Sequence, residues 1–226
     1  YTEMSITETG GQKRKENRDK RLQEILEAGK EIFAELGLAA ANMKDVAKKA
    51  GLSRASLYRY FTSKEELAFA IERHFYQEIL LPQHRKQLAN ASGSGYDKVA
   101  YNLQLILKSY QIYPDYYKFT GAFDHYFNYR RPPEELAEEM QQIFNKGFDE
   151  DPMITFINEG INDGSLRPDL DAQLTAKTID QTLLSFCQRI AARSEELSLE
   201  FNIDEPDKMV EHLVTIILNG IRNPSC

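Results

Sequence analysis

The sequence predicts an all-α protein with a small N-terminal domain and a larger C-terminal domain. Apolar residues recur at three- and four-residue steps along most of the chain, helix caps and stops separate these segments, and no convincing strand pattern occurs. The 226 residues are enough for two unequal domains. We expect a flexible basic tail over residues 1–17, a helix-turn-helix domain over residues 18–64 and a second helical domain over residues 65–226.

Capping residues divide the N-terminal part into four helices. The apolar stripe of the first helix ends at Gly37, which is a typical stop. Amide or hydroxyl side chains then stand where the next three helices begin, and Glu66 completes a capping box at the fourth. The helices are expected over residues 18–36, 43–50, 54–61 and 64–81, the last three after Asn42, Ser53 and Ser63.

The remainder is divided by loops rich in Gly, Ser and Pro. Residues 89–95 form a loop by composition, and Pro82 and residues 131–133 are expected to break helices. Gly164 closes another helix. Six helices are expected here, over residues 96–112, 114–130, 133–148, 152–163, 171–192 and 206–219, which makes about ten in all.

Charge is unevenly distributed between the two parts. The formal net charge is -7, but residues 12–64 carry +6 and residues 65–226 carry -11. A basic end on an acidic body suggests that the N-terminal segment meets a polyanion, although two solvated surfaces of different sign give the same numbers. The two cysteines exclude a disulfide framework, and no segment has the length and apolarity of a membrane helix or a secretion leader. The expected location is therefore the cytoplasm.

Residues 43–61 have the pattern of a helix-turn-helix. Two short helices flank a turn that contains Gly51, and Val46 and Ala47 of the first can pack against Leu57 and Phe61 of the second. This packing directs a polar, basic face of the second helix outward, as a DNA recognition helix requires. One alternative is a basic helical hairpin in which the two tyrosines are packing anchors. Another is a helical module that binds a protein or an anionic surface through this basic end.

Candidate DNA contacts follow from the chemistry of the exposed side chains. Arg54 and Arg59 suit guanine edges or phosphates, and Ala55 permits close approach to a thymine methyl. Hydroxyls and amines around the motif suit phosphate oxygens. The phosphate candidates are Lys44, Ser53, Ser56, Tyr58, Tyr60 and Lys64.

Residues 21–67 resemble the TetR family of transcriptional regulators. The resemblance is carried by the first helix, by Gly37, by the Ala50-Gly51-Leu52-Ser53 turn and above all by Leu57-Tyr58-Arg59-Tyr60-Phe61 followed by Ser63-Lys64-Glu65-Glu66-Leu67. It implies that residues 54–60 enter the major groove and that Tyr58, Tyr60 and Lys64 hold phosphates. Leu38 replaces a common aromatic, and Asn42-Met43 replaces a frequent Thr pair.

A cluster of Lys and Arg precedes the first apolar stripe. It is either an arm that follows the DNA backbone or enters a minor groove, or an ordinary solvated end of the chain. The cluster consists of Lys13, Arg14, Lys15, Arg18, Lys20 and Arg21.

Nine aromatic residues lie between positions 110 and 129, more than one helix face buries. Some are therefore expected to line a cavity or an interface, while core packing explains most of them singly. The resemblance implies an effector pocket in this domain. The candidate lining residues are Tyr110, Tyr113, Tyr117, Phe123, Tyr126 and Phe127.

The last two helices carry apolar stripes. Burial of these stripes within the same chain is one explanation. The resemblance implies that they pair with a second copy as a four-helix bundle, which predicts a homodimer on a palindromic operator. No spacing typical of a metal site, a catalytic triad or a phosphate loop occurs, so we expect no enzyme activity, no metal and no cofactor. The sequence thus predicts a DNA-binding regulator, a repressor released by a small apolar or amphipathic effector.

Overall fold

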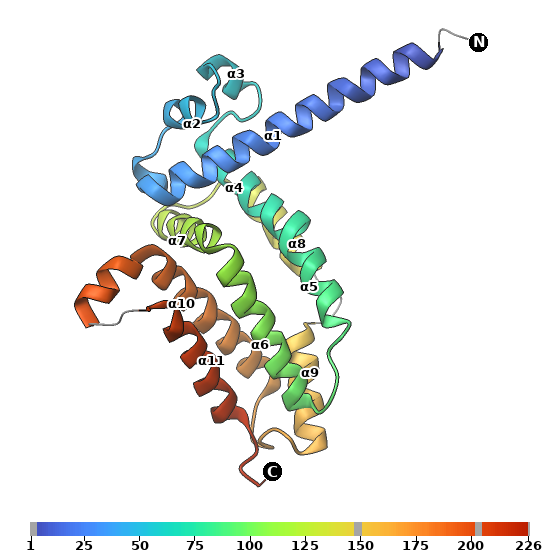
Figure 1. The fold of residues 1–226 in the computed structure, drawn as a ribbon, viewed down its shortest axis with the longest axis vertical. Coiled ribbons are helices and arrows are strands. Elements are labelled where there is room, and N and C mark those ends of the chain that lie inside the picture. The colour runs from blue at the N-terminus through green and yellow to red at the C-terminus, as the bar shows by residue number, and fades with distance from the viewer. Residues whose placement is uncertain (1–3, 147–150, 202–204, 226) are drawn as a thin grey trace.

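The computed structural model describes residues 4–146, 151–201 and 205–225, and the all-α prediction is confirmed (Figure 1). Pairing of β type within these residues is limited to one isolated bridge between Leu166 and Arg222. The helices are α1 (Met4–Ala40), α2 (Met43–Lys49), α3 (Arg54–Tyr58), α4 (Lys64–His74), the π-helix η1 (Phe75–Leu80), α5 (Leu81–Leu88), α6 (Gly95–Ile112), α7 (Pro114–Asn128), α8 (Glu134–Lys146), α9 (Pro152–Asp163), α10 (Ala172–Phe201) and α11 (Asp207–Ile221).

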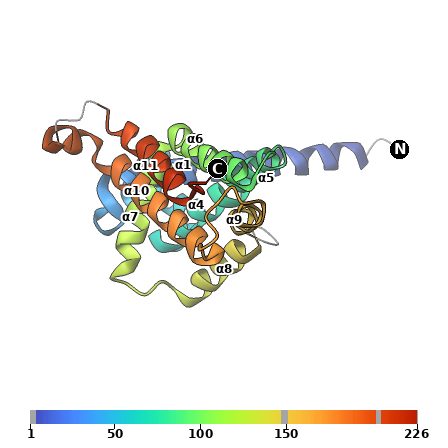
Figure 2. The ribbon, with the colours of Figure 1, turned by 90° about the horizontal axis from the view of Figure 1, so that it is seen from below.

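Helix α1 begins much earlier than the sequence predicts. The expectation of a flexible tail over residues 1–17 is wrong for the described part, because α1 starts at Met4. Most residues from 12 to 21 are Gln, Lys, Arg or Glu, which are good helix formers, and Arg21 Nη1 pairs with Glu24 Oε2 at 2.6 Å. Figure 2 shows the N-terminal half of α1 extending beyond the rest of the molecule.

Pro82 does not end the fourth helix. Helices α4, η1 and α5 follow one another without a break from Lys64 to Leu88, and Pro82 lies in the first turn of α5. A first-turn position suits proline, because the missing N–H is not needed there. The widened π-turn before it marks the place where the hydrogen-bonding register changes.

Two further predicted helix ends lie at residues 192 and 148. The helix predicted to end at about residue 192 is interrupted by a non-helical kink at Arg193 (φ -135°, ψ 26°), and a second helical segment, not predicted, continues α10 to Phe201. The kink allows one continuous segment to change direction where the apolar stripe ends. The predicted end of a helix at Phe148 lies outside the described residues.

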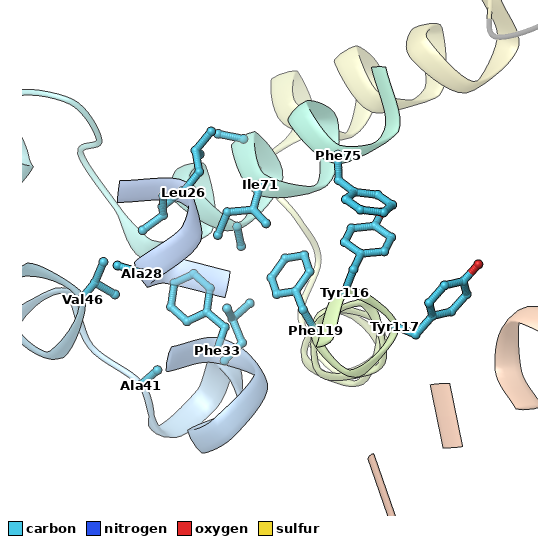
Figure 3. Packing of buried hydrophobic residues seen from close by; sticks show 14 of the residues in the cluster. Leu26, Ala28, Phe33, Ala41, Val46, Ile71, Phe75, Tyr116, Tyr117 and Phe119 are labelled. Atoms are coloured by element: carbon cyan, nitrogen blue, oxygen red, sulfur yellow. The ribbon is translucent and has the colours of Figure 1, made fainter. Parts of the chain in front are cut away.

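The larger of two buried clusters joins the N-terminal helices to the second domain. It combines residues of α1–α4 with aromatic residues of α7 and apolar residues of α10 and α11. Phe33 of α1 stacks on Phe119 of α7 with ring centroids 6.4 Å apart, and the Phe75 ring lies 3.4 Å from that of Tyr116 (Figure 3). The second cluster is formed by α6, α9, α10 and α11 with the segment around Leu166.

Two helix crossings depend on glycine. A Cβ placed on Gly29 of α1 would lie 3.0 Å from Ile71 Cδ1 of α4, which fixes how closely these helices approach. A Cβ on Gly95 of α6 would lie 2.0 Å from the backbone nitrogen of Gly160 in α9. The second crossing therefore excludes every larger residue at position 95 unless the backbone moves.

Candidate functional site

The helix-turn-helix forms over α2 and α3 as the spacing predicts. Asn42 Oδ1 accepts the backbone N–H groups of Lys44 at 3.0 Å and Asp45 at 3.2 Å, and the Asp45 carboxylate accepts from the Asn42 N–H in return. Gly51 adopts φ 64° in the turn, and the Leu52 N–H donates to the Ala47 carbonyl at 2.8 Å. The turn is therefore fixed by local hydrogen bonds.

The second helix has the predicted inner face. Leu57 is fully buried and Phe61 is 6 % exposed, and both belong to the cluster that contains Val46 and Ala47 of α2. Helix α3 itself ends at Tyr58, three residues earlier than expected, and turns lead the chain on to Phe61. The predicted burial of Leu57 and Phe61 is therefore correct, although the helix is shorter than predicted.

The outer face of α3 presents the predicted small, basic and hydroxyl side chains. Arg54, Ala55 and Arg59 are exposed, and Tyr58 is 42 % exposed. Exposed Lys44 lies in the first turn of α2. These five side chains remain candidates for groove and phosphate contacts.

Three predicted contact residues are linked to one another. Ser53 Oγ caps α3 by accepting the Ser56 N–H at 3.1 Å, and it donates to Ser56 Oγ at 2.9 Å. Arg59 Nη2 donates to the same Ser56 hydroxyl at 3.4 Å. This arrangement holds the Arg59 guanidinium beside the N-terminal turn of α3, an environment that favours an anion such as phosphate.

Two other predicted phosphate contacts are placed differently. Tyr60 is half-buried and packs against the N-terminal core. Lys64 directs its ammonium group inward, where Nζ donates to the carbonyls of Leu38, Ala39 and Ala41 at 2.6, 3.1 and 3.1 Å. The inward direction of Lys64 does not fit the expected phosphate contact.

The basic cluster that precedes the first apolar stripe is helical and exposed. All six cations lie on the projecting half of α1. A helix cannot follow a minor groove as an extended arm does, so a contact of this half with DNA would be made with backbone phosphates. The six residues are Lys13, Arg14, Lys15, Arg18, Lys20 and Arg21.

The six aromatic residues predicted for a pocket do not share one cavity. Phe123 and Phe127 pack edge-on against Phe69 of α4, with ring centroids 5.0 and 5.1 Å apart. Tyr110 donates to Asp207 Oδ1 of α11 at 2.5 Å, and burial and this bond both raise its pKa. These rings form the contacts of α7 and α6 with neighbouring helices, as core packing predicts. Their part in effector binding stays a prediction.

A small cavity of about 80 Å³ lies between α5 and α6. Tyr113 and Tyr117 of the predicted set line it, together with Leu80 of η1 and apolar residues of α6. Gln83 Nε2 donates to Tyr113 Oη at 3.1 Å, and the His84 ring nitrogen Nε2 lies 2.7 Å from Asn102 Oδ1. Burial lowers the pKa of His84, and the bond to Asn102 partly opposes this. The cavity is thus mainly apolar and has a few oriented polar groups, as small-molecule sites do, but it is smaller than the roughly 300–1,000 Å³ typical of such sites.

Sequence reasoning missed the polar groups of η1, α5 and the end of α4. Glu72 lies buried opposite Tyr116, whose hydroxyl donates to Glu72 Oε1 at 2.7 Å, and burial raises the pKa of Glu72 to about 7. Gln83 and His84 line the cavity, although Pro82 had indicated a helix end just before them. The run of helix formers from residue 83 to 88 is the signal that shows the helix continues.

The described part of the chain lacks two other features that would define a functional site. No group of three His, Cys, Asp or Glu residues there is close enough to hold a metal ion. Across the same residues, no helix combines the length and apolar character needed to cross a bilayer.

The fold and the exposed face of α3 define a helix-turn-helix DNA-binding protein with a helical second domain. Residues 25–71 match the sequence model of the family described as "Bacterial regulatory proteins, tetR family". Residues 25–71 therefore form a DNA-binding domain of the kind found in this family of transcriptional regulators. The match extends into α4, seven residues beyond the boundary expected at position 64.

Similarity to known proteins covers both domains. The chain is 28% identical over 211 residues to the HTH-type transcriptional repressor KstR2 of Rhodococcus jostii, covering 89% of this chain and 91% of the relative. The solved structure of the ketosteroid transcriptional regulator KstR2 of Mycobacterium tuberculosis superposes with TM-score 0.61 at 21% identity, over 89% of this chain and 95% of that chain. That of FadR from Bacillus subtilis in complex with stearoyl-CoA gives TM-score 0.62 at 18% identity, over 88% and 99%. The two structural likenesses show a shared fold.

Proposed function

We propose that the chain is a cytoplasmic, homodimeric transcriptional repressor that binds a palindromic operator and is released by a small amphipathic effector. The observation that carries the proposal is the two-sided helix α3. Leu57 is fully buried, whereas Arg54, Ala55 and Arg59 are exposed on a domain that matches the TetR family. A rigid helix with one basic, small-residue face suits a major groove. The name of the Rhodococcus relative supports repression.

The dimer proposal rests on the apolar surface of α10 and α11. Leu174 and Ile216 are 65 % and 54 % exposed, and a shallow groove lined by Phe186, Met209 and Leu213 lies beside Ile216. Two such faces related by a twofold axis would bury this surface and place two copies of α3 on successive turns of DNA. Replacement of Ile216 by Glu is therefore expected to give monomers by analytical ultracentrifugation and to weaken operator binding.

The effector proposal rests on the cavity between α5 and α6. Its lining combines aliphatic residues with polar ones. The polar lining residues include Gln83, His84, Lys108, Ser109, Tyr113 and Tyr117. Such a site suits an apolar body with a polar or anionic end. The stearoyl-CoA named for the FadR structure has an apolar chain and an anionic end, and the cavity of about 80 Å³ would have to widen to admit such a chain.

The proposal is tested by selecting bound sequences from random duplex DNA with the full-length protein. We expect an inverted repeat whose half-sites are one helical turn or a little more apart. Stearoyl-CoA is then added to the complex, with free coenzyme A as the control for its polar end. Failure to enrich any DNA, together with binding to anionic vesicles or to an acidic protein, would instead favour the alternative of a basic helical module for another partner.

A further inference from the structure

Lys64 closes the turn between α1 and α2. Gly37, where φ is 73° and ψ is 150°, interrupts α1 near its end, and the short segment after it leads to α2 at Met43. Nζ of Lys64 lies within 2.6 to 3.1 Å of three carbonyl oxygens of this turn, those of Leu38, Ala39 and Ala41. An ammonium group has three donors and no acceptor, so three carbonyls satisfy it completely. The first residue of α4 therefore fixes the segment that leads into the helix-turn-helix.

Tyr126 of α7 lies on the same ammonium group. Its ring centroid is 5.3 Å from Lys64 Nζ and 4.4 Å from the Arg130 guanidinium carbon, and its hydroxyl donates to Glu65 Oε1 at 2.5 Å. The side chain is 6 % exposed, so these cation–π contacts are partly shielded from water. One residue of the second domain thus contacts both residues that open α4.

We propose that Lys64 and Tyr126 are positioning residues that connect α7 to the helix-turn-helix, and that Lys64 does not contact a DNA phosphate. The proposal rests on the proposed operator binding. Lys64 sets the α1–α2 turn, and Tyr126 sets Lys64 and Glu65 from the side of the second domain. A displacement of α7 moves Tyr126, and the turn that positions α2 and α3 moves with it.

A phosphate contact by Lys64 would undo this arrangement. To reach DNA, the ammonium would leave three carbonyls of one turn, and these would need water as their new donor. Lys44 offers the contrasting case, because its side chain is exposed and only its backbone N–H takes part in the Asn42 cap. The two lysines differ in a measurable way: a phosphate contact contributes to the salt dependence of binding, whereas an internal hydrogen bond does not.

The first test compares the salt dependence of operator binding for Lys64→Met and Lys44→Met. For Lys64→Met we expect operator affinity to fall about tenfold or more, with the slope of log Kd against log salt equal to that of the wild type. Loss of one phosphate contact per protomer would reduce the slope by about 2 for a dimer, and we expect this for Lys44→Met. A reduction of about 2 for Lys64→Met, or unchanged affinity, would overturn the proposal. If the wild-type protein enriches no DNA, the proposed function itself fails.

The second test does not require removal of the lysine. Tyr126→Phe keeps the ring over Lys64 and removes only the bond to Glu65, while Tyr126→Leu removes both. We expect operator affinity to decrease in the order wild type, Phe, Leu, with the wild-type salt slope throughout. The combined Lys64→Met and Tyr126→Leu variant should lose less than the sum of the two single losses, because both act through one contact. Wild-type affinity of Tyr126→Leu, or strictly additive losses, would contradict the proposal.

Discussion

The buried carboxyl group of Glu72 makes the stability of this protein depend on pH. Tyr116 donates to Oε1 at 2.7 Å, but the buried oxygen Oε2 has no hydrogen-bond partner. Burial raises the pKa of Glu72 to about 7 from 4.5; the bond from Tyr116 opposes this increase and the nearby Asp124 adds to it. A group with this environment favours the protonated form in the folded chain.

The direction of the effect follows from proton binding. Below pH 4.5 the carboxyl group is protonated in both the folded and the unfolded chain, so it does not lower the free energy of unfolding. Between pH 4.5 and 7 the folded chain binds more protons than the unfolded chain, so the free energy of unfolding falls as pH rises. Above pH 7 the loss is complete and amounts to about 3 kcal/mol for the two pKa values.

Glu72→Gln removes this loss while keeping the acceptor for Tyr116. At pH 8 the variant is expected to be more stable by up to about 3 kcal/mol, which raises Tm by roughly 6 to 12 °C for a chain of this size. At pH 5 the advantage shrinks to less than about 1 kcal/mol. Thermal unfolding followed by circular dichroism measures both values. The exposed residue Glu138 supplies the matched control, Glu138→Gln. An equal difference at the two pH values, or a variant less stable than the wild type at pH 8, would refute the reasoning.

Three further substitutions test the interface and the core. Arg54→Ala should weaken operator binding more than binding to random DNA in competition titrations. Equal losses would indicate that Arg54 contacts phosphates instead of bases. Leu57→Ala should lower the free energy of unfolding by about 2 to 5 kcal/mol in urea, and a change below 1 kcal/mol would show that this site is loosely packed. Gly95→Ala places a Cβ 2.0 Å from Gly160 N, so it should cost several kcal/mol, and wild-type Tm would show that α6 and α9 separate easily.

The sequence was most informative where local patterns decide the structure. Asn42, Ser53 and Ser63 each cap a helix as predicted, because a cap involves only neighbouring residues. The burial of Leu57 and Phe61 also followed from spacing alone, since the two residues lie on one face of the chain segment. Capping residues and helical periodicity were therefore sufficient for the helix-turn-helix.

The direction of Lys64 was not predictable in the same way. Its carbonyl partners lie 23 to 26 residues earlier, and they converge only when α1 and α4 pack together. Local sequence shows a lysine at the start of a helix and gives no sign of that convergence. Similarly, the number of rings between residues 110 and 129 did not reveal which of them face Phe69, because this depends on how α7 crosses α4.

Two of the errors in helix length, at the N-terminus and at Pro82, have the same physical origin. The tail prediction gave weight to the absence of large apolar residues, but charged helix formers also sustain a projecting helix. At Pro82 the sequence signal for a break was strong, and a π-turn with the proline in a first turn accommodated it. In both places the backbone stays helical, although rules based on single residues predict a tail or a break.

The large buried cluster that runs from α1 through α4 into α7 has a consequence for engineering. Because Phe33 of α1 stacks on Phe119 of α7 and Gly29 fits against Ile71 of α4, a graft that exchanges residues 1–64 as a block would disturb both contacts at the seam. A chimaera with a new operator preference is better made by replacing only the solvent-facing side chains of α3. The interior then stays native, and the donor protein supplies only the exposed side chains that face DNA.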